Sequence, residues 1–323
     1  MTRFAAVDCG TNSIRLLISE VHDGVTTEVC RLMEIVRLGQ GVDATGELAP
    51  DSIERARLAL KRYVELMQEH GVQAVRMVAT SATRDARNKD EFFAMTGSLL
   101  GRIAPGVKAE VISGEEEASL SFRGAVADLG GEPGPLCVID LGGGSTEFIV
   151  GELSGEVYGS HSAHMGCVRL TERIMRTDPP TATEIEIARD YVAERIAQVE
   201  KIVPIERTST FVCCAGTFTT LAAMALGLEN YDPAAIHDSR LRLDALQVIT
   251  AQLIAETSAQ RAAHPVMHPG RADVIAGGAV VVEGIVDMIR RKTNADRIVI
   301  SEKDILDGII AGLAESYEQA PPV

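Results

Sequence analysis

The chain has 323 residues, of which 46% are hydrophobic, so it is long and apolar enough to bury two separate cores. Its formal net charge of −15 argues against nonspecific binding to nucleic acid or to a membrane surface. The longest apolar run, residues 274–282, is far shorter than the roughly 20 residues that a membrane span needs, so we expect no membrane partner.

The first expected element is a strand over residues 5–7, which leads into the glycine loop Asp8-Cys-Gly-Thr-Asn-Ser13 and then into a second strand over residues 14–20. Glycine tolerates positive φ, so consecutive backbone N–H groups in such a turn can converge on an anion, of which phosphate is the usual one. The predicted phosphate ligands of this loop are Gly10, Thr11, Asn12 and Ser13.

Further strands are expected over residues 26–38, followed by a helix from Pro50 to about His70 and a strand over residues 75–79. Arg84 follows that strand directly. Its position alone fits a solvated surface better than a ligand site.

A helix that begins near Ser113 and Gly114 carries three adjacent carboxylates, those of Glu115, Glu116 and Glu117. Acidic residues in the first turn of a helix complement its dipole, which is the simpler explanation. A carboxylate held in a phosphate site can instead act as a general base toward water. The residues alone leave both explanations open.

A second glycine loop, Asp140-Leu-Gly-Gly-Gly-Ser-Thr-Glu147, follows the linker over residues 128–135 and a buried strand over residues 136–139. Asp8, Gly10 and Ser13 match Asp140, Gly142 and Ser145 at one constant offset, which indicates two related domains. Asp140 and Glu147 flank the turn and are suited to hold a hydrated Mg²⁺. The predicted phosphate ligands of this loop are Gly142, Gly143, Gly144, Ser145 and Thr146.

The rest of the chain alternates helices and strands. Thr181 and Glu184 predict a capping box for a helix that reaches about Ile202. Gly216 and Thr217 follow a strand and open a helix, where they form either a third anion contact or an ordinary tight turn. The remaining expected elements are helices over residues 244–256 and 304–317, a helix after Asp273, a strand over residues 297–300 and a disordered tail over residues 320–323.

Both glycine loops resemble the phosphate loops of the actin, sugar-kinase and heat-shock-chaperone superfamily. The chain resembles more narrowly the exopolyphosphatase/guanosine pentaphosphatase branch, whose motifs it matches in order. Besides the two loops, the stretches that match the family's motifs are residues 79–88 (Ala-Thr-Ser-Ala-Thr-Arg-Asp-Ala-Arg-Asn), 112–118 (Ile-Ser-Gly-Glu-Glu-Glu-Ala), 165–172 (Met-Gly-Cys-Val-Arg-Leu-Thr-Glu), 215–217 (Ala-Gly-Thr) and 270–274 (Gly-Arg-Ala-Asp-Val).

The resemblance implies an α/β fold of two ribonuclease-H-like domains, with mixed sheets flanked by helices and a cleft between the domains. The expected domains are residues 1–127, joined by the helix over residues 304–317, and residues 136–303. The resemblance also implies Mg²⁺-dependent or Mn²⁺-dependent hydrolysis of the terminal phosphoanhydride of inorganic polyphosphate, in a homodimer.

The resemblance assigns roles to individual residues. It implies Glu117 as the general base, with Glu116 as the second choice. It places the metal on Asp140 and Glu147, with Asp8 assisting. Arg84, Arg271 and Arg15 would then hold phosphates and offset the acidic net charge locally.

Three other functions remain open at this point. A guanosine pentaphosphate 5′-phosphohydrolase belongs to the same family, and the motifs do not rank the two substrates. An ATP-dependent sugar kinase would need an adenosine-binding glycine motif that this chain matches poorly, and a nucleotide-dependent assembly module would have no use for the Glu-Glu-Glu-Ala stretch. The absence of a recognisable signal peptide and of Cys-x-x-Cys spacing among the six cysteines favours a reduced, cytoplasmic protein.

Overall fold

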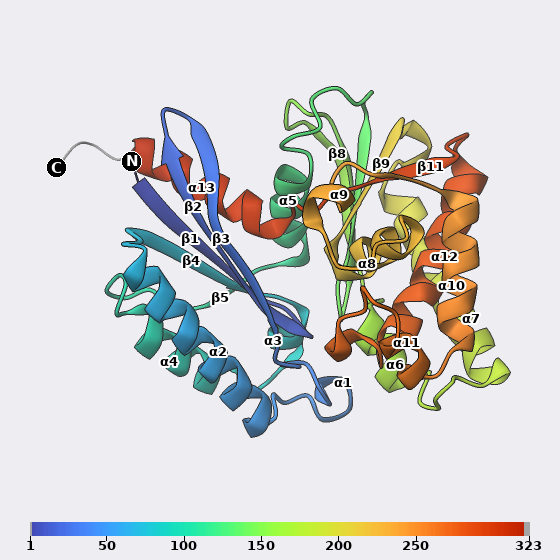
Figure 1. Cartoon of the computed structure of the whole chain (residues 1–323), viewed down its shortest axis with the longest axis horizontal. Helices are drawn as coiled ribbons and strands as arrows, with labels where there is room; N and C mark the ends of the chain where they lie inside the picture. Colours follow the sequence, from blue (N-terminus) through green and yellow to red (C-terminus); the bar gives the residue numbers. More distant parts are fainter. Residues whose placement is uncertain (1, 320–323) are drawn as a thin grey trace. The chain divides into compact units, whose positions relative to one another are not determined.

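The computed structural model describes residues 2–319, which divide into two compact units (Figure 1). The described part of the first unit consists of residues 2–124 and 305–319, and the second unit of residues 125–304. Residues 128–135, expected as a linker, belong to the second unit. The tail expected to be disordered, residues 320–323, lies outside the described residues.

The first unit contains a five-stranded mixed sheet in the order β3-β2-β1-β4-β5. Strands β3, β2 and β1 pair antiparallel, whereas β1, β4 and β5 pair parallel. Asp23 and Gly24 have positive φ in the tight turn between β2 and β3, as that turn type requires. The strands are β1 (Thr2–Cys9), β2 (Ser13–His22), β3 (Val25–Ile35), β4 (Ala74–Ala79) and β5 (Glu110–Val111).

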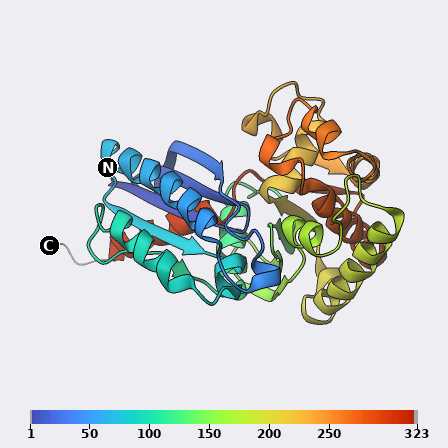
Figure 2. The ribbon, with the colours of Figure 1, turned by 90° about the horizontal axis from the view of Figure 1, so that it is seen from below.

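Helices cover both faces of this sheet, and side-chain alternation along β1 decides what each face buries. Ala5, Val7 and Cys9 pack in the core that includes α2 and α4, which lie in front of the sheet in Figure 2. Phe4 and Ala6 pack on the other face, in the core that includes α13. The helices of this unit are α1 (Val42–Thr45), α2 (Pro50–Glu69), α3 (Ser81–Asp85), α4 (Lys89–Leu100), α5 (Gly114–Ala125) and α13 (Ile305–Gln319).

The second unit contains a six-stranded sheet in the order β10-β11-β9-β6-β7-β8. Its strands β6, β7 and β8 pair antiparallel, and β6, β9 and β11 pair parallel. Both sheets therefore place an antiparallel three-stranded meander beside parallel strands, which confirms the predicted pair of mixed α/β sheets. The strands are β6 (Leu136–Leu141), β7 (Thr146–Gly151), β8 (Val157–Ala163), β9 (Thr210–Cys214), β10 (Arg240–Arg242) and β11 (Arg297–Ile300).

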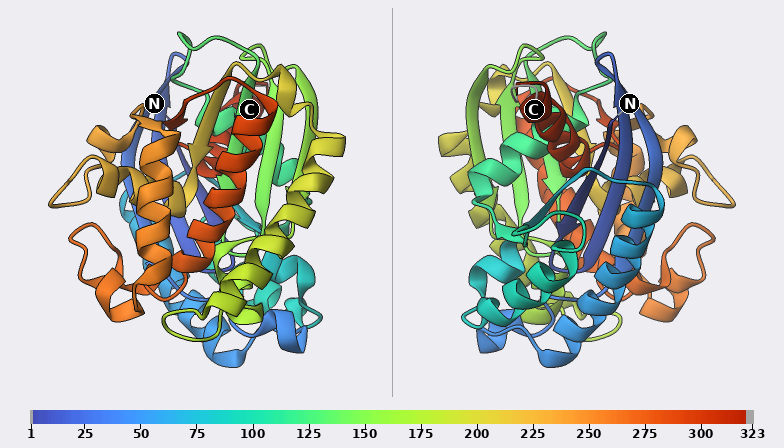
Figure 3. Two further views of the ribbon diagram at one scale, coloured as in Figure 1. Left: turned by 90° about the vertical axis from the view of Figure 1, so that its right-hand side faces the viewer. Right: turned by 90° about the vertical axis from the view of Figure 1, so that its left-hand side faces the viewer.

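Three long helices of the second unit, α7, α10 and α12, lie over its sheet in the left view of Figure 3. The capping box of α7 is confirmed, since Thr181 accepts a bond from the Glu184 amide and Glu184 accepts one from the Thr181 amide. The helices are α6 (Cys167–Arg173), α7 (Ala182–Ile202), α8 (Ala215–Ala225), α9 (Pro233–Ile236), α10 (Leu243–Ala255), α11 (Ser258–Ala262) and α12 (Ile275–Lys292), with 3₁₀ turns η1 (Ile205–Arg207) and η2 (Pro269–Arg271).

Five helices and strands of the described residues were not predicted: α1, α4, α9, β10 and α11. Four of them have only three to five residues, which is too short for an apolar period to show. Among the described helices, none combines the length and the apolar character that crossing a bilayer requires.

Candidate functional site

The two glycine loops have the same construction. In the first, Gly10 N donates to Ser13 O at 3.0 Å, and Asp8 and Arg15 are Cα partners across the hairpin. In the second, Gly142 N donates to Ser145 O at 3.0 Å. Its flanking Cα partners are Asp140 and Glu147. The constant offset seen in the sequence therefore reflects two equivalent β-hairpins, one in each unit.

The carbonyl groups of the first loop are bound from behind by the chain that follows β3. Thr11 O accepts a bond from Gly39 N at 2.8 Å, and Asn12 O accepts one from Arg37 N at 2.8 Å. In a planar trans peptide the N–H group points opposite to the carbonyl. The amides of Asn12 and Ser13 therefore point away from the backing segment, the orientation that an anion on the other side requires.

The second loop is backed in the same way by the start of α6. Gly143 O accepts bonds from Val168 N at 2.9 Å and Arg169 N at 3.0 Å. Gly144 O accepts a bond from Arg169 Nε at 2.7 Å. The amides of Gly144 and Ser145 point the opposite way, again as an anion site requires.

One glycine in each backing segment allows the close approach, and neither glycine had been predicted as a site residue. A Cβ atom on Gly39 would lie 2.3 Å from Thr11 Cγ2. A Cβ atom on Gly166 would lie 2.4 Å from Gly143 O. Thr11 and Gly143 occupy the same place in their loops, so the two units use the same packing device. The signals in the sequence were weak: Gly166 lies in the stretch over residues 165–172 that resembles the family, and Gly39 is followed two residues later by Gly41.

The expected reason for the first glycine of each loop is wrong. Gly10 and Gly142 have φ outside the left-handed region, so neither position needs a residue that tolerates positive φ. At Gly142 the constraint is space, because a Cβ atom would lie 3.2 Å from Ser145 O. At Gly10 the same contact with Ser13 O would be 3.7 Å, which is ordinary packing.

Asp140 and Glu147 form a paired set of carboxylates suited to a cation. They stand directly opposite each other on β6 and β7, so their side chains leave the same face of the sheet, and they are 7% and 1% exposed. Ser162, the partner of Glu147 on β8, donates from Oγ to Glu147 Oε1 at 2.7 Å. Two buried carboxylates at directly opposite strand positions repel each other when both are ionised, and a hard cation offsets this repulsion.

The equivalent place in the first unit already carries its own cation. Arg15 donates from Nη2 and Nε to Asp8 Oδ2 at 2.7 and 3.1 Å. The second hairpin has a carboxylate, Glu147, where the first has Arg15, so the second fits a metal better than the first. No group of three or more His, Cys, Asp or Glu side chains suited to a metal occurs among residues 2–319. A pair of carboxylates is nonetheless enough for Mg²⁺, which keeps several waters and uses substrate phosphates as ligands.

The structure separates the two candidate general bases. Glu117 is 8% exposed, and its Oε2 accepts a bond from Arg84 Nη1 at 2.8 Å. Arg84 Nη1 also donates to Ile112 O at 2.9 Å, which fixes the guanidinium. Glu116 is exposed and accepts a bond from Arg76 Nη2 at 2.6 Å instead. Only Glu117 lies in a buried, positively charged environment.

A hydroxyl pair joins the first loop to the helix that carries Arg84. Thr11 Oγ1 and Ser81 Oγ are 2.9 Å apart, and both residues are buried. Ser81 opens α3, and Arg84 lies one turn further. The phosphate loop and the Arg84–Glu117 pair are thus parts of one connected arrangement within the first unit. Ser81 was not predicted as a site residue, although its motif was noted.

Gly216 and Arg271 come together in the second unit. A Cβ atom on Gly216 would lie 1.1 Å from Arg271 Nη1, so the guanidinium rests directly on this glycine. Ala215, which opens α8, has a φ of 68°, a strained value for a residue with a side chain. The positive end of the α8 dipole and the positively charged Arg271 guanidinium are adjacent here, which favours an anion site over a plain turn.

The positive charge of Arg271 also affects the pKa values of two neighbouring side chains. Burial lowers the pKa of His268, and the Arg271 charge lowers it further. Burial raises the pKa of the Cys167 thiol, and Arg271 opposes this effect. The predicted ligand Thr217 is buried against α12, since a Cβ atom on Gly278 would lie 2.8 Å from its Oγ1.

Comparison with known proteins identifies relatives of the whole chain. A model of the Ppx/GppA phosphatase family matches residues 17–316. The chain is 54% identical over 318 residues to exopolyphosphatase 2 of Mycobacterium tuberculosis, an alignment that covers 97% of this chain and 99% of the relative.

Two further relatives broaden the comparison. The chain is 36% identical over 185 residues to a guanosine-5′-triphosphate,3′-diphosphate pyrophosphatase of Vibrio cholerae, covering 57% of this chain and 36% of that protein. The crystal structure of the Aquifex aeolicus Ppx/GppA family member matches with a TM-score of 0.79 and 30% identity over 99% of both chains.

Proposed function

Because the chain belongs to the Ppx/GppA phosphatase family, we propose that it is an exopolyphosphatase, which hydrolyses the terminal phosphoanhydride of inorganic polyphosphate and releases orthophosphate. One observation carries this proposal: each unit has a glycine loop whose carbonyl groups are bound from behind, so that its amides point the other way. Backbone amides that point away from a backing segment suit the oxygens of a phosphate group.

Phosphate binding falls to the loops and to three arginines. The proposed ligands are the amides of residues 10–13 and 142–146, together with Gly216, Thr217 and the Arg271 guanidinium beside them. Arg84 and Arg15 add positive charge in the first unit, where each also neutralises a carboxylate. This local charge offsets a net charge of −15, which would otherwise repel a polyanion.

Asp140 and Glu147 would hold Mg²⁺ or Mn²⁺, and Ser162 would orient Glu147. A bound divalent cation neutralises charge on the phosphoryl group that is transferred. Asp8 was predicted to assist, and this stays a prediction. Its contacts with Arg15 support a role in fixing that guanidinium.

Glu117 is the proposed general base. Its carboxylate accepts the proton of the attacking water, so that the oxygen forms its bond to the terminal phosphorus as the bond to the bridging oxygen breaks. Arg84 holds the carboxylate in one orientation, and its positive charge favours the ionised form that a base requires. The exposed Glu116, engaged with Arg76, lacks this environment.

The second candidate is hydrolysis of guanosine pentaphosphate. The guanosine-5′-triphosphate,3′-diphosphate pyrophosphatase of Vibrio cholerae supports it, but over a smaller part of the chain than the exopolyphosphatase relative. Both substrates present a terminal phosphoanhydride to the same groups. The near full-length relative therefore decides in favour of polyphosphate.

We also propose a homodimer in a reducing cytoplasm. The six cysteines lie within residues 2–319, and none of them forms a disulfide. The edge strand β3 exposes the apolar side chains of Val25, Val29 and Leu32, which supports contact with a second copy. Sedimentation of the purified chain measures this directly, and a monomer at all concentrations would reject it.

The deciding experiment compares four substrates under one condition. Phosphate release from short polyphosphate, long polyphosphate, guanosine pentaphosphate and ATP is measured with Mg²⁺ and the same enzyme. We expect the highest kcat/KM for a polyphosphate. A higher value for guanosine pentaphosphate would transfer the chain to the second candidate. Turnover of ATP alone, dependent on an alcohol acceptor, would indicate a kinase.

A further inference from the structure

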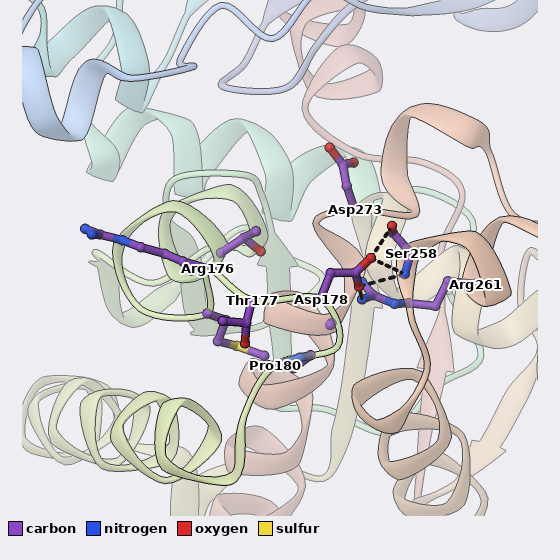
Figure 4. A pocket seen from close by; sticks show the side chains of 10 residues that line it. Arg176, Thr177, Asp178, Pro180, Ser258, Arg261 and Asp273 are labelled. Carbon is purple, nitrogen blue, oxygen red and sulfur yellow. Dashed lines mark hydrogen bonds and ion pairs between the residues drawn. The ribbon is translucent and has the colours of Figure 1, made fainter.

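A pocket of ≈ 190 Å³ lies in the second unit and is lined in part by Asp273, two residues after Arg271. Its walls come from α6 and the segment after it, from α11, and from Asp273 and the start of α12. Figure 4 shows Asp178, Ser258 and Arg261 pointing toward one another, with Asp273 at another part of the wall. The lining also includes Arg176, Thr177 and Pro180.

Arg261 is the unusual member of this lining because it is a charged residue that is only 2% exposed. Its Nη2 donates to Asp178 Oδ1 at 2.9 Å, its Nε donates to Glu256 O at 3.2 Å, and its Nη1 donates to Ala272 O at 2.7 Å. Burial lowers the pKa of Arg261, and Asp178 opposes this effect. A buried guanidinium is costly to desolvate, and these three hydrogen bonds offset that cost.

The bond to Ala272 connects Arg261 to the turn that carries Arg271, because Ala272 directly follows Arg271. The turn η2 is only three residues long, and Arg271 N donates to His268 O within it. Arg261 therefore holds the carboxyl end of the same short turn whose Arg271 guanidinium rests on Gly216. A shift of the Ala272 carbonyl would move Arg271 relative to the start of α8.

Asp178 completes the arrangement from a third segment. It accepts bonds from Ser258 N at 2.8 Å, from Ser258 Oγ at 2.6 Å and from Arg261. The bonds to Ser258 are the main reason that the pKa of Asp178 is lowered, so the carboxylate stays ionised at neutral pH. The charge of Arg261 is thus balanced without any group from the phosphate site.

We infer that Arg261, oriented by Asp178, is a positioning residue for Arg271 and through it sets the affinity for the substrate's phosphate groups. The inference rests on the proposed function, since it requires that Arg271 binds phosphate. Arg261 itself does not touch substrate. Its effect must therefore pass through Arg271, and this makes it separable from a general loss of stability.

A double-mutant cycle tests this dependence. Tripolyphosphate binding is measured calorimetrically without divalent cations for wild type, Arg261→Ala, Arg271→Ala and the double variant. We expect each single variant to raise Kd about 10- to 100-fold, the range for a lost hydrogen bond to a charged group. The double variant should bind no more weakly than Arg271→Ala, because the two changes remove one interaction. Additive losses would overturn the inference.

The pocket offers a second, independent measurement. Arg261→Ala leaves a space that adjoins the pocket, so added guanidinium ion, at concentrations far below those that denature, should restore binding. The same ion should not restore Arg271→Ala to the same degree, because Arg271 is not among the residues that line this pocket. Absence of rescue in Arg261→Ala would contradict the positioning role.

Two further variants keep the test decisive if Arg261→Ala does not fold. Arg261→Lys keeps the charge but cannot reach all three partners, and Asp178→Asn removes the orienting charge from a side chain that is 46% exposed. Both should raise Kd by less than Arg261→Ala and keep kcat near wild type. Arg290→Ala, which breaks an ion pair with Asp244 in the same unit, is the matched control and should leave Kd unchanged.

Wild-type protein that binds tripolyphosphate neither without divalent cations nor with Mg²⁺ would overturn the proposed function, and this role with it. Wild-type binding with unchanged Kd in folded Arg261→Lys and Asp178→Asn would overturn the positioning role alone.

Discussion

Arg84 Nη1 lies 2.8 Å from Glu117 Oε2, and the two side chains are only 19% and 11% exposed. The arginine comes from α3, which directly follows β4, and the glutamate from the first turn of α5, which follows β5. Since β4 and β5 are parallel neighbours, the elements that follow them start at the same edge of the sheet. The pairing therefore follows from the sheet topology, and it distinguishes Glu117 from its neighbours Glu115 and Glu116.

Glu117→Gln should lower kcat about 100- to 10,000-fold, the usual range for a general base. The amide keeps the shape and can still meet Arg84 but cannot accept the proton of water. KM should stay near wild type or fall, because one negative charge is removed from a site for a polyanion. Steady-state phosphate release measures both constants. Glu116→Gln is the matched control, and a loss of kcat in Glu116→Gln alone would move the base by one residue.

Arg84→Ala should raise KM for polyphosphate more than Glu117→Gln does, because it removes a positive charge as well as the partner of Glu117. The kcat should fall too, since Glu117 loses the bond that orients it. Arg84→Lys should recover part of KM but less of kcat, because one ammonium group cannot replace the guanidinium bonds to both Glu117 and Ile112. An unchanged KM in both variants would remove Arg84 from the site.

Asp140→Asn and Glu147→Gln should each lower kcat strongly and raise the Mg²⁺ concentration for half-maximal activity, because each removes a hard anionic oxygen. Ser162→Ala should raise that concentration about 10- to 100-fold, the range for the loss of a group that orients a metal ligand. Titrating activity with Mg²⁺ gives all three values. A variant with wild-type Mg²⁺ dependence would show that its residue does not serve the metal.

Acidification should destabilise the fold through His268. Burial lowers its pKa from 6.5, so in the interval just below pH 6.5 the unfolded chain binds more protons than the folded one. The free energy of unfolding should therefore fall as the pH falls through this interval. Protonation would also break the bond in which Nδ1 accepts from Gly270 N. His268→Asn keeps an acceptor without a titrating group and should flatten the dependence in urea titrations at several pH values. An equally steep fall in that variant would assign the effect to other groups.

The features that depend only on residues close in sequence could be predicted from local sequence patterns. The capping box of Thr181 and Glu184, the stop of α2 before Gly71 and both glycine loops depend on neighbours within a few residues. The apolar spacing of α2 likewise follows from its own period, and the residues of that stripe, Ile53, Ala56, Leu60, Val64 and Met67, are buried.

Long-range contacts were not predictable in the same way. Glu116 and Glu117 look alike in sequence, and only the positions of Arg76 and Arg84 separate them. The packing of Gly166 against Gly143 joins two separate segments of the chain, and the residues next to either glycine do not indicate this contact. The resemblance to a family indicated which motifs matter, whereas the physical reason for each glycine came from the three-dimensional contacts.

The last prediction concerns the two glycines that back the phosphate loops. Gly166→Ala should be the more damaging change, because its Cβ would meet the backbone of Gly143 at 2.4 Å, and backbone cannot rotate away. We expect the free energy of unfolding to fall by about 1–3 kcal/mol, the cost of overpacking, and kcat/KM to fall as the loop amides move. Gly39→Ala should cost less, because its main clash is with a side-chain methyl group, Thr11 Cγ2.

The difference between the two clashes supplies a specific rescue. Thr11→Ser removes Cγ2 and keeps the hydroxyl that pairs with Ser81, so it should restore much of the stability and kcat/KM of Gly39→Ala. Gly312→Ala on α13 is the control, since its Cβ would enter open space and alanine favours a helix over glycine. Urea titration and steady-state kinetics on the same preparations give both quantities. If Gly39→Ala and Gly166→Ala behave like Gly312→Ala, close backing does not hold the loops in place; if Thr11→Ser fails to rescue Gly39→Ala, the contact with Cγ2 is not what matters.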